Sequence, residues 1–308
     1  MSLRMRIIGG ALRPMIRAVM ARAQDPVPLR RHLDRSMKYQ FRAPPLARFD
    51  AVDVGGCRAL WVVCGPALRQ PAADPRVILY LHGGGYIAGS PDTHKKMVAR
   101  LSKMTGVRVF LPSYRLAPEH PLPAALDDAR AAWDHLISLG YGPDDIVLGG
   151  DSAGGGLVLS LLSQLCLTGT PPRAVFAWSP FTDQTFSGAS VHENARRDHF
   201  FPAARVHDLP AMILGDLSPT DPRVSPLFAD FPDCPPVLLQ ASDCEILYDD
   251  SVRMEAVLRA GGGQVLLQTF AGAPHVWQLF DGWFPEAREA IGLTADFIQT
   301  CARPQHGN

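Results

Sequence analysis

Five residues in the middle of the chain, Gly150-Asp151-Ser152-Ala153-Gly154, have the composition of a tight turn that presents a serine. They follow an apolar run at 146–148, predicted to be a buried strand, and precede an apolar segment at 154–167, predicted to be a helix. Small neighbours let strand and helix approach closely, so the serine hydroxyl stands above the sheet at the helix N-terminus. Ser152 is therefore the candidate nucleophile, and Asp151 is expected to brace the turn.

A glycine-rich segment, His82-Gly83-Gly84-Gly85, follows another apolar run at 77–81. Consecutive glycines let backbone N–H groups approach a ligand oxygen without an intervening side chain. Together with the amide of Ala153, these glycine amides are the predicted oxyanion hole, which holds a carbonyl oxygen as it becomes negatively charged. The glycine run at 261–263 lacks this context and is expected to be a plain loop.

A serine nucleophile needs a base to accept its proton. In proteins with this strand–turn–helix arrangement, the acid and then the histidine follow the serine along the chain. His275 comes after a predicted strand at 265–269 and meets this order, whereas His306 lies in the terminal segment, which is expected to fray. His275 is therefore the predicted base.

The acid that orients the histidine should follow the preceding strand, at 237–240, on the carboxyl edge of the sheet. Asp243 and Glu245 both lie there and remain alternatives. Asp249 and Asp250 begin the next predicted helix, where negative charge is favourable in itself. Cys244, between the two candidate acids, is interpreted as a small apolar filler.

Several aromatic side chains near the predicted loop ends could line a substrate pocket, although core packing explains each of them equally well. They are Tyr86, Trp178, Phe181, Phe200 and Phe201.

Apolar runs of strand length alternate with helical patterns, which predicts a parallel, doubly wound α/β sheet. The predicted strands lie at 51–54, 59–63, 77–81, 107–111, 146–148, 174–178, 237–240 and 265–269, and the helices at 95–105, 124–139, 154–167, 248–259 and 286–301. Residues 180–233 have no steady period and interrupt this alternation, as an inserted lid or binding loop would.

Residues 1–24 contain five arginines and no acidic residue. Apolar residues recur there at helical spacing, which predicts an amphipathic helix packed on the body or over a pocket. Arg13, Pro14 and Arg17 interrupt the apolar run that a secretory signal would need. A membrane-surface helix and an organelle-targeting peptide remain the alternatives.

The composition excludes several classes of protein. The 308 residues carry 30 basic and 30 acidic side chains, and a net charge of zero argues against nucleic-acid binding. No apolar run reaches the ~18 residues that a membrane span requires. Six cysteines without Cys-x-x-Cys spacing or a Cys/His cluster predict reduced thiols and no zinc site.

Four segments, in order, resemble the blocks of the hormone-sensitive-lipase-like esterases of the α/β-hydrolase superfamily. They are the motifs at 82–85 and 150–154, the block Tyr114-Arg115-Leu116-Ala117-Pro118-Glu119-His120, and Pro274-His275. The resemblance covers residues 50–300 and implies an α/β-hydrolase fold with a mostly parallel, doubly wound sheet and a helical cap. Residues 1–50 and 180–233 would form the cap, and 51–179 with 234–308 the catalytic domain. The block at 114–120 is interpreted as structural, holding a turn behind the site.

The resemblance also addresses the acid. The family usually has an Asp at the start of an Asp-x-Leu-x-Asp stretch, and the aligned residues here are Glu245-Ile246-Leu247-Tyr248-Asp249. Glu245 therefore takes the position of the acid, in a departure from the usual residue.

The activity that the resemblance implies is that of a serine carboxylesterase for short- to medium-chain acyl esters, with an acyl-enzyme intermediate and neither metal nor organic cofactor. The triad alone leaves lactone, amide and carbamate cleavage open, as well as a receptor on this fold that has lost catalysis. A small ester is the expected partner, with no nucleic acid and no stable membrane insertion, and a homodimer is left open. Four lysines against 26 arginines suggest a GC-rich genome, and we expect a bacterial cytoplasmic enzyme.

Overall fold

The computed structural model describes the chain except residues 23–27, 29, 32–34, 37–41, 69–74 and 302–308. Within this part, eight strands form one sheet in the order β1-β2-β4-β3-β5-β6-β7-β8. β2 pairs antiparallel with β1 and with β4, and the other neighbours are parallel. The strands are β1 (Arg48–Val54), β2 (Cys57–Val63), β3 (Val77–Leu81), β4 (Arg108–Pro112), β5 (Ile146–Asp151), β6 (Ala174–Trp178), β7 (Val237–Ser242) and β8 (Val265–Phe270). The predicted α/β sheet is confirmed.

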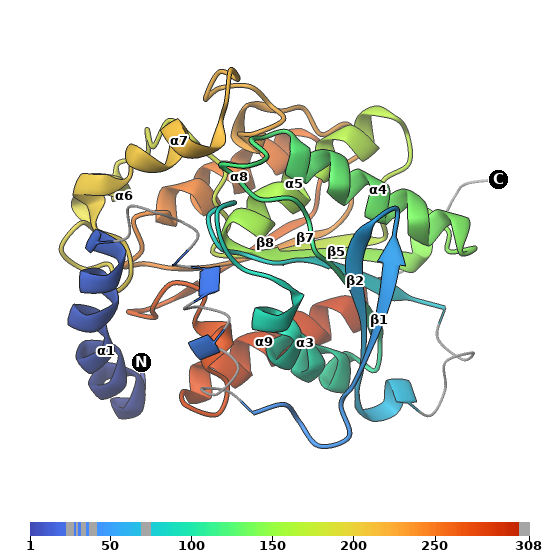
Figure 1. The fold of residues 1–308 in the computed structure, drawn as a ribbon, viewed down its shortest axis with the longest axis horizontal. Helices are drawn as coiled ribbons and strands as arrows, with labels where there is room; N and C mark the ends of the chain where they lie inside the picture. Colours follow the sequence, from blue (N-terminus) through green and yellow to red (C-terminus); the bar gives the residue numbers. More distant parts are fainter. Residues whose placement is uncertain (23–27, 29, 32–34, 37–41, 69–74, 302–308) are drawn as a thin grey trace.

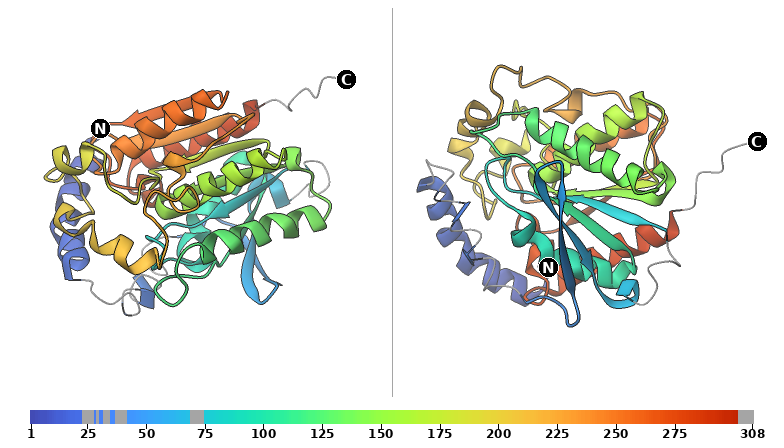
Figure 2. Two further views of the ribbon diagram at one scale, coloured as in Figure 1. Left: turned by 90° about the horizontal axis from the view of Figure 1, so that it is seen from above. Right: turned by 45° about the vertical axis from the view of Figure 1, so that its right-hand side comes forward.

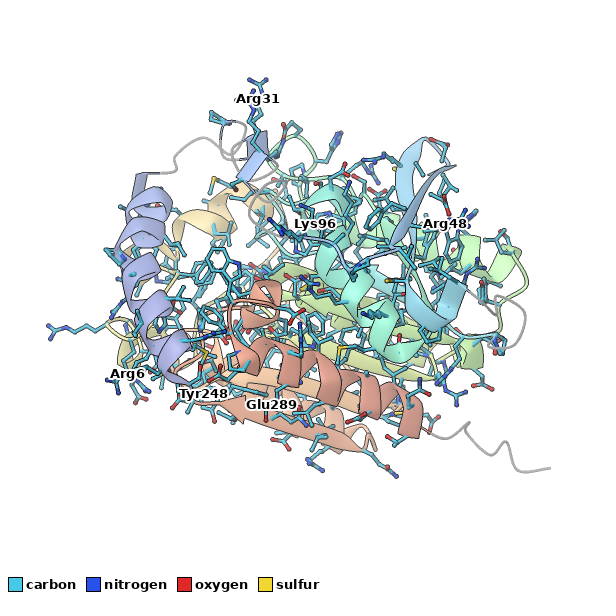
Figure 3. All side chains as sticks on the ribbon, turned by 90° about the horizontal axis from the view of Figure 1, so that it is seen from below. Arg6, Arg31, Arg48, Lys96, Tyr248 and Glu289 are labelled. Carbon is cyan, nitrogen blue, oxygen red and sulfur yellow. The ribbon has the colours of Figure 1, made fainter. Side chains whose placement is uncertain are left out.

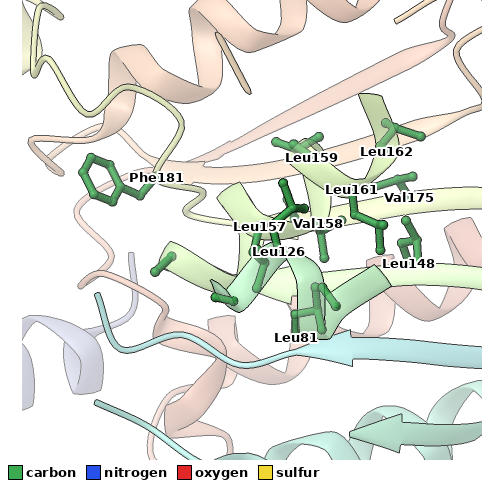
Figure 4. Close-up of a cluster of buried hydrophobic side chains, with 14 of the residues drawn as sticks. Leu81, Leu126, Leu148, Leu157, Val158, Leu159, Leu161, Leu162, Val175 and Phe181 are labelled. Atoms are coloured by element: carbon green, nitrogen blue, oxygen red, sulfur yellow. The ribbon is translucent and has the colours of Figure 1, made fainter. Parts of the chain in front are cut away.

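Helices cover both faces of this sheet (Figure 1). α3 (Pro91–Thr105) and α9 (Pro285–Thr300) pack on one face, and α4 (Ala124–Ser138), α5 (Ser152–Leu167) and α8 (Tyr248–Ala260) on the other. Figure 4 shows the core beneath α5, where leucine and valine side chains of the helix meet those of the central strands. Because α5 is apolar on all sides, nearly all of its residues are buried.

Two element boundaries differ from the sequence prediction in ways that matter for the site. β5 continues to Asp151 and α5 begins at Ser152, so the serine lies directly at the junction of strand and helix. α3 begins at Pro91, earlier than predicted, because Ser90 and Thr93 form a capping box and proline suits the first helical position.

The irregular segment between β6 and β7 contains only the short helices α6 (Ser190–Glu193) and α7 (Asp208–Ile213) and a few 3-10 turns. The N-terminal helix α1 (Leu3–Arg22) lies at the same end of the molecule (Figure 2). Arg17 of α1 donates hydrogen bonds of 3.0 Å to the main-chain oxygens of Ala195 and Asp198. The predicted helix is thus present and contacts the inserted segment, although Ile7 of its predicted apolar pattern is exposed.

The surface carries many charged side chains, and that of Arg6 projects away from α1 (Figure 3). Among the helices of the described residues, none is both long and apolar enough to cross a membrane. All six cysteines lie in the described part, and all are free.

Candidate active site

The turn between β5 and α5 holds Ser152 in the left-handed region, with a φ of 51°. Strand and helix approach too closely there for larger residues. A Cβ on Gly150 would lie 2.5 Å from the main-chain oxygen of Gly154, and one on Gly154 would lie 2.1 Å from the oxygen of Leu81. The two glycines therefore permit the strained turn, which aims the serine hydroxyl away from the sheet.

His275 lies in the loop after β8 and meets Ser152 across the carboxyl edge of the sheet. Its Nε2 is 2.8 Å from Ser152 Oγ, and its Nδ1 is 2.6 Å from Glu245 Oε2. All three side chains are buried. A serine, a histidine and a carboxylate in this order can move a proton from the serine hydroxyl to an imidazole that the acid holds in place.

Glu245 itself is held by two donors to its other oxygen. Ser179 Oγ and the amide of Ser242 each donate to Glu245 Oε1 at 2.8 Å. The alternative acid, Asp243, points elsewhere: its carboxylate accepts the amide of Gly272 and pairs with Arg197 at 3.3 Å. Of the two candidates, the structure brings Glu245 to the histidine.

Of the three glycines predicted to form the oxyanion hole, Gly83 has a different role in the structure. The amide of Gly83 donates to Asp151 Oδ1 at 3.1 Å, so it serves the scaffold and not an oxyanion. Gly84 and Gly85 have φ angles of 125° and 64°, and their amides have no hydrogen-bond acceptor among the described residues. Ala153 lies in the first turn of α5, where amides have no intrahelical partner. The candidate oxyanion donors are therefore Gly84, Gly85 and Ala153.

Residues 78–279 match the protein family described as having an alpha/beta hydrolase fold. An acetyl-hydrolase of Streptomyces hygroscopicus is 36% identical over 252 residues, which cover 82% of each chain. An esterase of Acinetobacter venetianus is 34% identical over 239 residues, covering 76% of this chain and 78% of that one. The crystal structure of an esterase from the bacterial hormone-sensitive lipase family superposes with a TM-score of 0.89 at 35% identity, covering 98% of this chain and 99% of that chain. The chain belongs to the hormone-sensitive-lipase-like α/β hydrolases.

Asp151 braces the elbow of this hydrolase, as the sequence predicts. Its Oδ1 also accepts the Tyr80 hydroxyl at 2.7 Å, and His94 Nε2 lies 3.4 Å away. Burial alone would raise the pKa of Asp151, but the His94 imidazole and the Tyr80 hydroxyl outweigh it and hold that pKa below its usual range. The carboxylate is therefore an anion that anchors the Gly83 amide.

His82 supports the same loop from behind. Its ring stacks on Tyr114 at 4.2 Å between centroids, and the Tyr114 hydroxyl donates to the main-chain oxygen of His82. Complete burial lowers the pKa of His82 to about 3, so the ring is neutral. Tyr114 thus fastens its block to the back of the glycine loop, consistent with a structural role.

The electrostatics of His275 favour its protonated form. Burial would lower the pKa of His275, but the adjacent Glu245 carboxylate, through its charge and hydrogen bond, raises it above the ordinary value. The rings of Phe201 and Phe200 meet the imidazole edge-to-face, at 4.8 and 6.1 Å between centroids. These two phenylalanines shield the imidazole on the side of the inserted segment.

Trp178 does not lie at the site, contrary to the tentative prediction. Its indole is completely buried and packs on Tyr80 and Phe176, and its Nε1 donates to Thr294 Oγ1 of α9 at 3.0 Å. The side chain of a residue at the end of β6 can point to either face of the sheet, and this one joins the core beneath α9.

Phe181 and Tyr86 both lie against the helix that begins with the serine. The amide of Phe181 donates to the main-chain oxygen of Ser152 at 3.0 Å, and its ring packs on Phe186 at 5.0 Å. Tyr86 follows the glycine loop with a φ of 61°, and both aromatic side chains are buried.

Two residues of the site escaped the sequence analysis. Ser179 follows β6 directly, and its position at the carboxyl edge of a strand was the one signal that could have found it. Asp198 lies in the inserted segment, where no periodicity or motif identifies it, and accepts the amide of Ile246 next to the acid.

Proposed function

We propose that this hydrolase cleaves carboxylic esters with short to medium acyl chains through an acyl-enzyme intermediate. The observation that carries the proposal is the continuous relay from Ser152 Oγ through both nitrogens of His275 to Glu245. Relatives named esterase and acetyl-hydrolase support ester chemistry and a small acyl group.

In the first step, Ser152 Oγ attacks the ester carbonyl while His275 Nε2 accepts its proton. Glu245 keeps the imidazole in the tautomer that has its free lone pair on Nε2, and stabilises the imidazolium that forms. The proton then passes from His275 to the departing alkoxide, which leaves as the alcohol.

The oxyanion of the tetrahedral intermediate would be held by the amides of Gly84, Gly85 and Ala153. Each such donor contributes about 10²–10³-fold to the rate in serine hydrolases. In the second step, His275 deprotonates a water molecule that attacks the acyl-serine, and Ser152 recovers its proton as the carboxylic acid leaves. Every proton thus travels through one imidazole.

We further propose that residues 1–50 and 180–233 form a cap over this centre. In support, the Leu209 side chain of α7 would lie 3.7 Å from a Cβ on Gly85, and Phe201 of the inserted segment meets His275. An insertion that covers both the glycine loop and the imidazole would limit the size of the acyl and alcohol groups.

Location and assembly stay predictions. Six free cysteines, five of them buried, support a reducing compartment such as the bacterial cytoplasm. A homodimer remains an open alternative.

The test is hydrolysis of p-nitrophenyl esters from acetate through butyrate and octanoate to palmitate, with Ser152→Ala protein as the control. We expect the highest kcat/KM with the short chains and no burst or turnover in the variant. If the protein cleaves lactones, amides or carbamates but no ester, the proposed function is wrong, and the same triad performs one of these other reactions. No turnover on any of them would support the receptor alternative.

A further inference from the structure

Asp198 is a carboxylate without accessible surface that the proposed mechanism does not use. Its Oδ1 accepts the amides of Phe200 and Phe201 at 2.6 and 2.8 Å, and its Oδ2 accepts the amide of Ile246 at 2.8 Å. Among the described residues, no cationic side chain forms an ion pair with this carboxylate. A buried carboxylate held by amides alone is costly to retain unless its charge or its geometry is used.

The three amides belong to two segments that flank the histidine, and hydrogen bonds from Asn194 and Arg197 also link these segments. Phe200 and Phe201 lie in the inserted segment and pack their rings against His275. Ile246 directly follows Glu245, the partner of His275 Nδ1. One carboxylate therefore joins the segment that shields the imidazole to the loop that orients it.

We propose that Asp198 is a positioning residue of this site: its carboxylate fastens the Phe200–Phe201 segment to the Glu245 loop around His275. The inference rests on the proposed function, because it assigns a role in the same proton relay. Charge-assisted hydrogen bonds are stronger than neutral ones, which suits a junction that must stay fixed while His275 gains and loses a proton.

The other titratable groups near this junction are either anions or neutral side chains. Glu245 and Asp151 are anions that, with Asp198, raise the pKa of His275 against the effect of burial. Burial, foremost, raises the pKa of the Cys244 thiol to about 12 and lowers the pKa of His199, so both side chains are neutral at neutral pH.

The remaining charges are engaged elsewhere. Arg197 pairs with Asp243, and Arg17 of α1 donates to the main-chain oxygen of Asp198 and not to its carboxylate. Burial raises the pKa of Asp198 above its ordinary value, while the three amides and the charge of His275 act against this rise. Within the described part of the chain, no cationic side chain forms an ion pair with this carboxylate.

Asp198→Asn removes the charge while keeping nearly the same side-chain size. The amide side chain keeps one accepting oxygen, so it can serve Phe200 and Phe201 or Ile246 but not both, and its NH₂ would face an N–H donor at the other end. The variant therefore removes the charge and cuts the junction on one side. Asp183→Asn is the control for the loss of a buried carboxylate, because Asp183 is equally buried and accepts the amides of Thr185 and Ser187. It differs from Asp198 in that it also pairs with Arg253 at 2.9 Å.

The deciding measurement is the pKa of His275, from the NMR titration of ¹³C-labelled imidazole, with His275→Ala protein to assign the signal. We expect Asp198→Asn to lower this pKa by about half a pH unit or more, and Asp183→Asn to leave it unchanged. The acid limb of kcat/KM should shift with it, and kcat should fall about tenfold, which corresponds to a modest loss of alignment.

A folded Asp198→Asn protein with the pKa and kcat of the wild type would overturn the inference. If that variant does not fold, Asp198→Glu decides, since it keeps the charge but lengthens the side chain. It should retain the raised pKa of His275 and lose kcat, and a fully active Asp198→Glu protein would contradict the fastening role. The NMR titration needs no turnover, so an inactive wild type would refute ester cleavage without refuting this coupling.

Discussion

Asp243 and Glu245 are two residues apart, yet only Glu245 forms a hydrogen bond with the imidazole of His275. Glu245 Oε2 lies 2.6 Å from His275 Nδ1, whereas the Asp243 carboxylate faces Arg197 and the amide of Gly272. The loop after β7 thus separates the two acids into different tasks. Asp243 ties the loop of the acid to the loop of the histidine, and Glu245 acts on the histidine itself.

Substitution of the two acids should therefore have unequal effects. Glu245→Gln leaves the size of the side chain but removes the charge that stabilises the imidazolium, and we expect kcat to fall about 10³-fold or more. Asp243→Asn should lower kcat by less than about tenfold, because it weakens only a half-exposed pair. Steady-state kinetics on one short ester measures both. Equal losses in the two variants would contradict the assignment of the acid.

The pH dependence follows from the charges around His275. The imidazole must be neutral to accept the serine proton, and its pKa lies above the ordinary value of 6.5. Activity should therefore rise with pH along an acid limb centred above 6.5. In Glu245→Gln the residual activity should have an acid limb at lower pH, since the charge that raises this pKa is gone. A profile of kcat/KM for both proteins checks the direction, and an upward shift in the variant would be inconsistent with it.

Gly84 and Gly262 offer a matched test of the glycine loop. Both have positive φ, but a Cβ on Gly84 would lie 2.1 Å from the main-chain oxygen of Ala88, whereas one on Gly262 meets open space. Gly84→Ala should displace the loop and lower kcat more than about 10²-fold, the value of one oxyanion donor. Gly262→Ala should cost about 1 kcal/mol of stability through strain and leave kcat unchanged. Kinetics and thermal unfolding of both variants separate the two effects, and comparable kcat values would remove Gly84 from the site.

Substitution of Trp178 should change the stability of the protein but not its activity. Trp178→Phe removes the hydrogen bond to Thr294 and part of the indole volume from the core beneath α9. We expect the free energy of unfolding to fall by about 1–2 kcal/mol with kcat/KM on short esters unchanged. Urea unfolding and kinetics measure the two quantities. A changed preference for acyl-chain length would instead place Trp178 in the pocket.

The sequence was sufficient for those parts of the site that lie at the ends of regular elements. Ser152 follows from glycines between an apolar strand and an apolar helix, and His275 from its place after β8. A pattern along one chain cannot say which way a side chain points in a loop, and this is why Asp243 remained an alternative. The prediction that Trp178 lines the substrate pocket was wrong for the same reason, because packing against α9 decides which face of the sheet its side chain joins.

Residues that act between distant segments were beyond the reach of the sequence. In the sequence, nothing distinguishes Gly83 from Gly84 and Gly85, and only the structure shows that Asp151 accepts the Gly83 amide. Asp198 lies in a segment without periodicity, and its role appears only when Phe201 and Ile246 are found around one carboxylate. Such contacts depend on long-range packing, which leaves no local pattern.

The most direct test of the central claim is to trap the nucleophile. The protein would be treated with a fluorophosphonate, which phosphonylates activated serines, and the modified peptide would be identified by mass spectrometry. We predict one adduct, on Ser152, that forms slowly or not at all in His275→Ala protein although Ser152 is still present. Rapid labelling of a different serine, or of Ser152 at the wild-type rate in His275→Ala, would contradict the relay from Glu245 through His275 to Ser152.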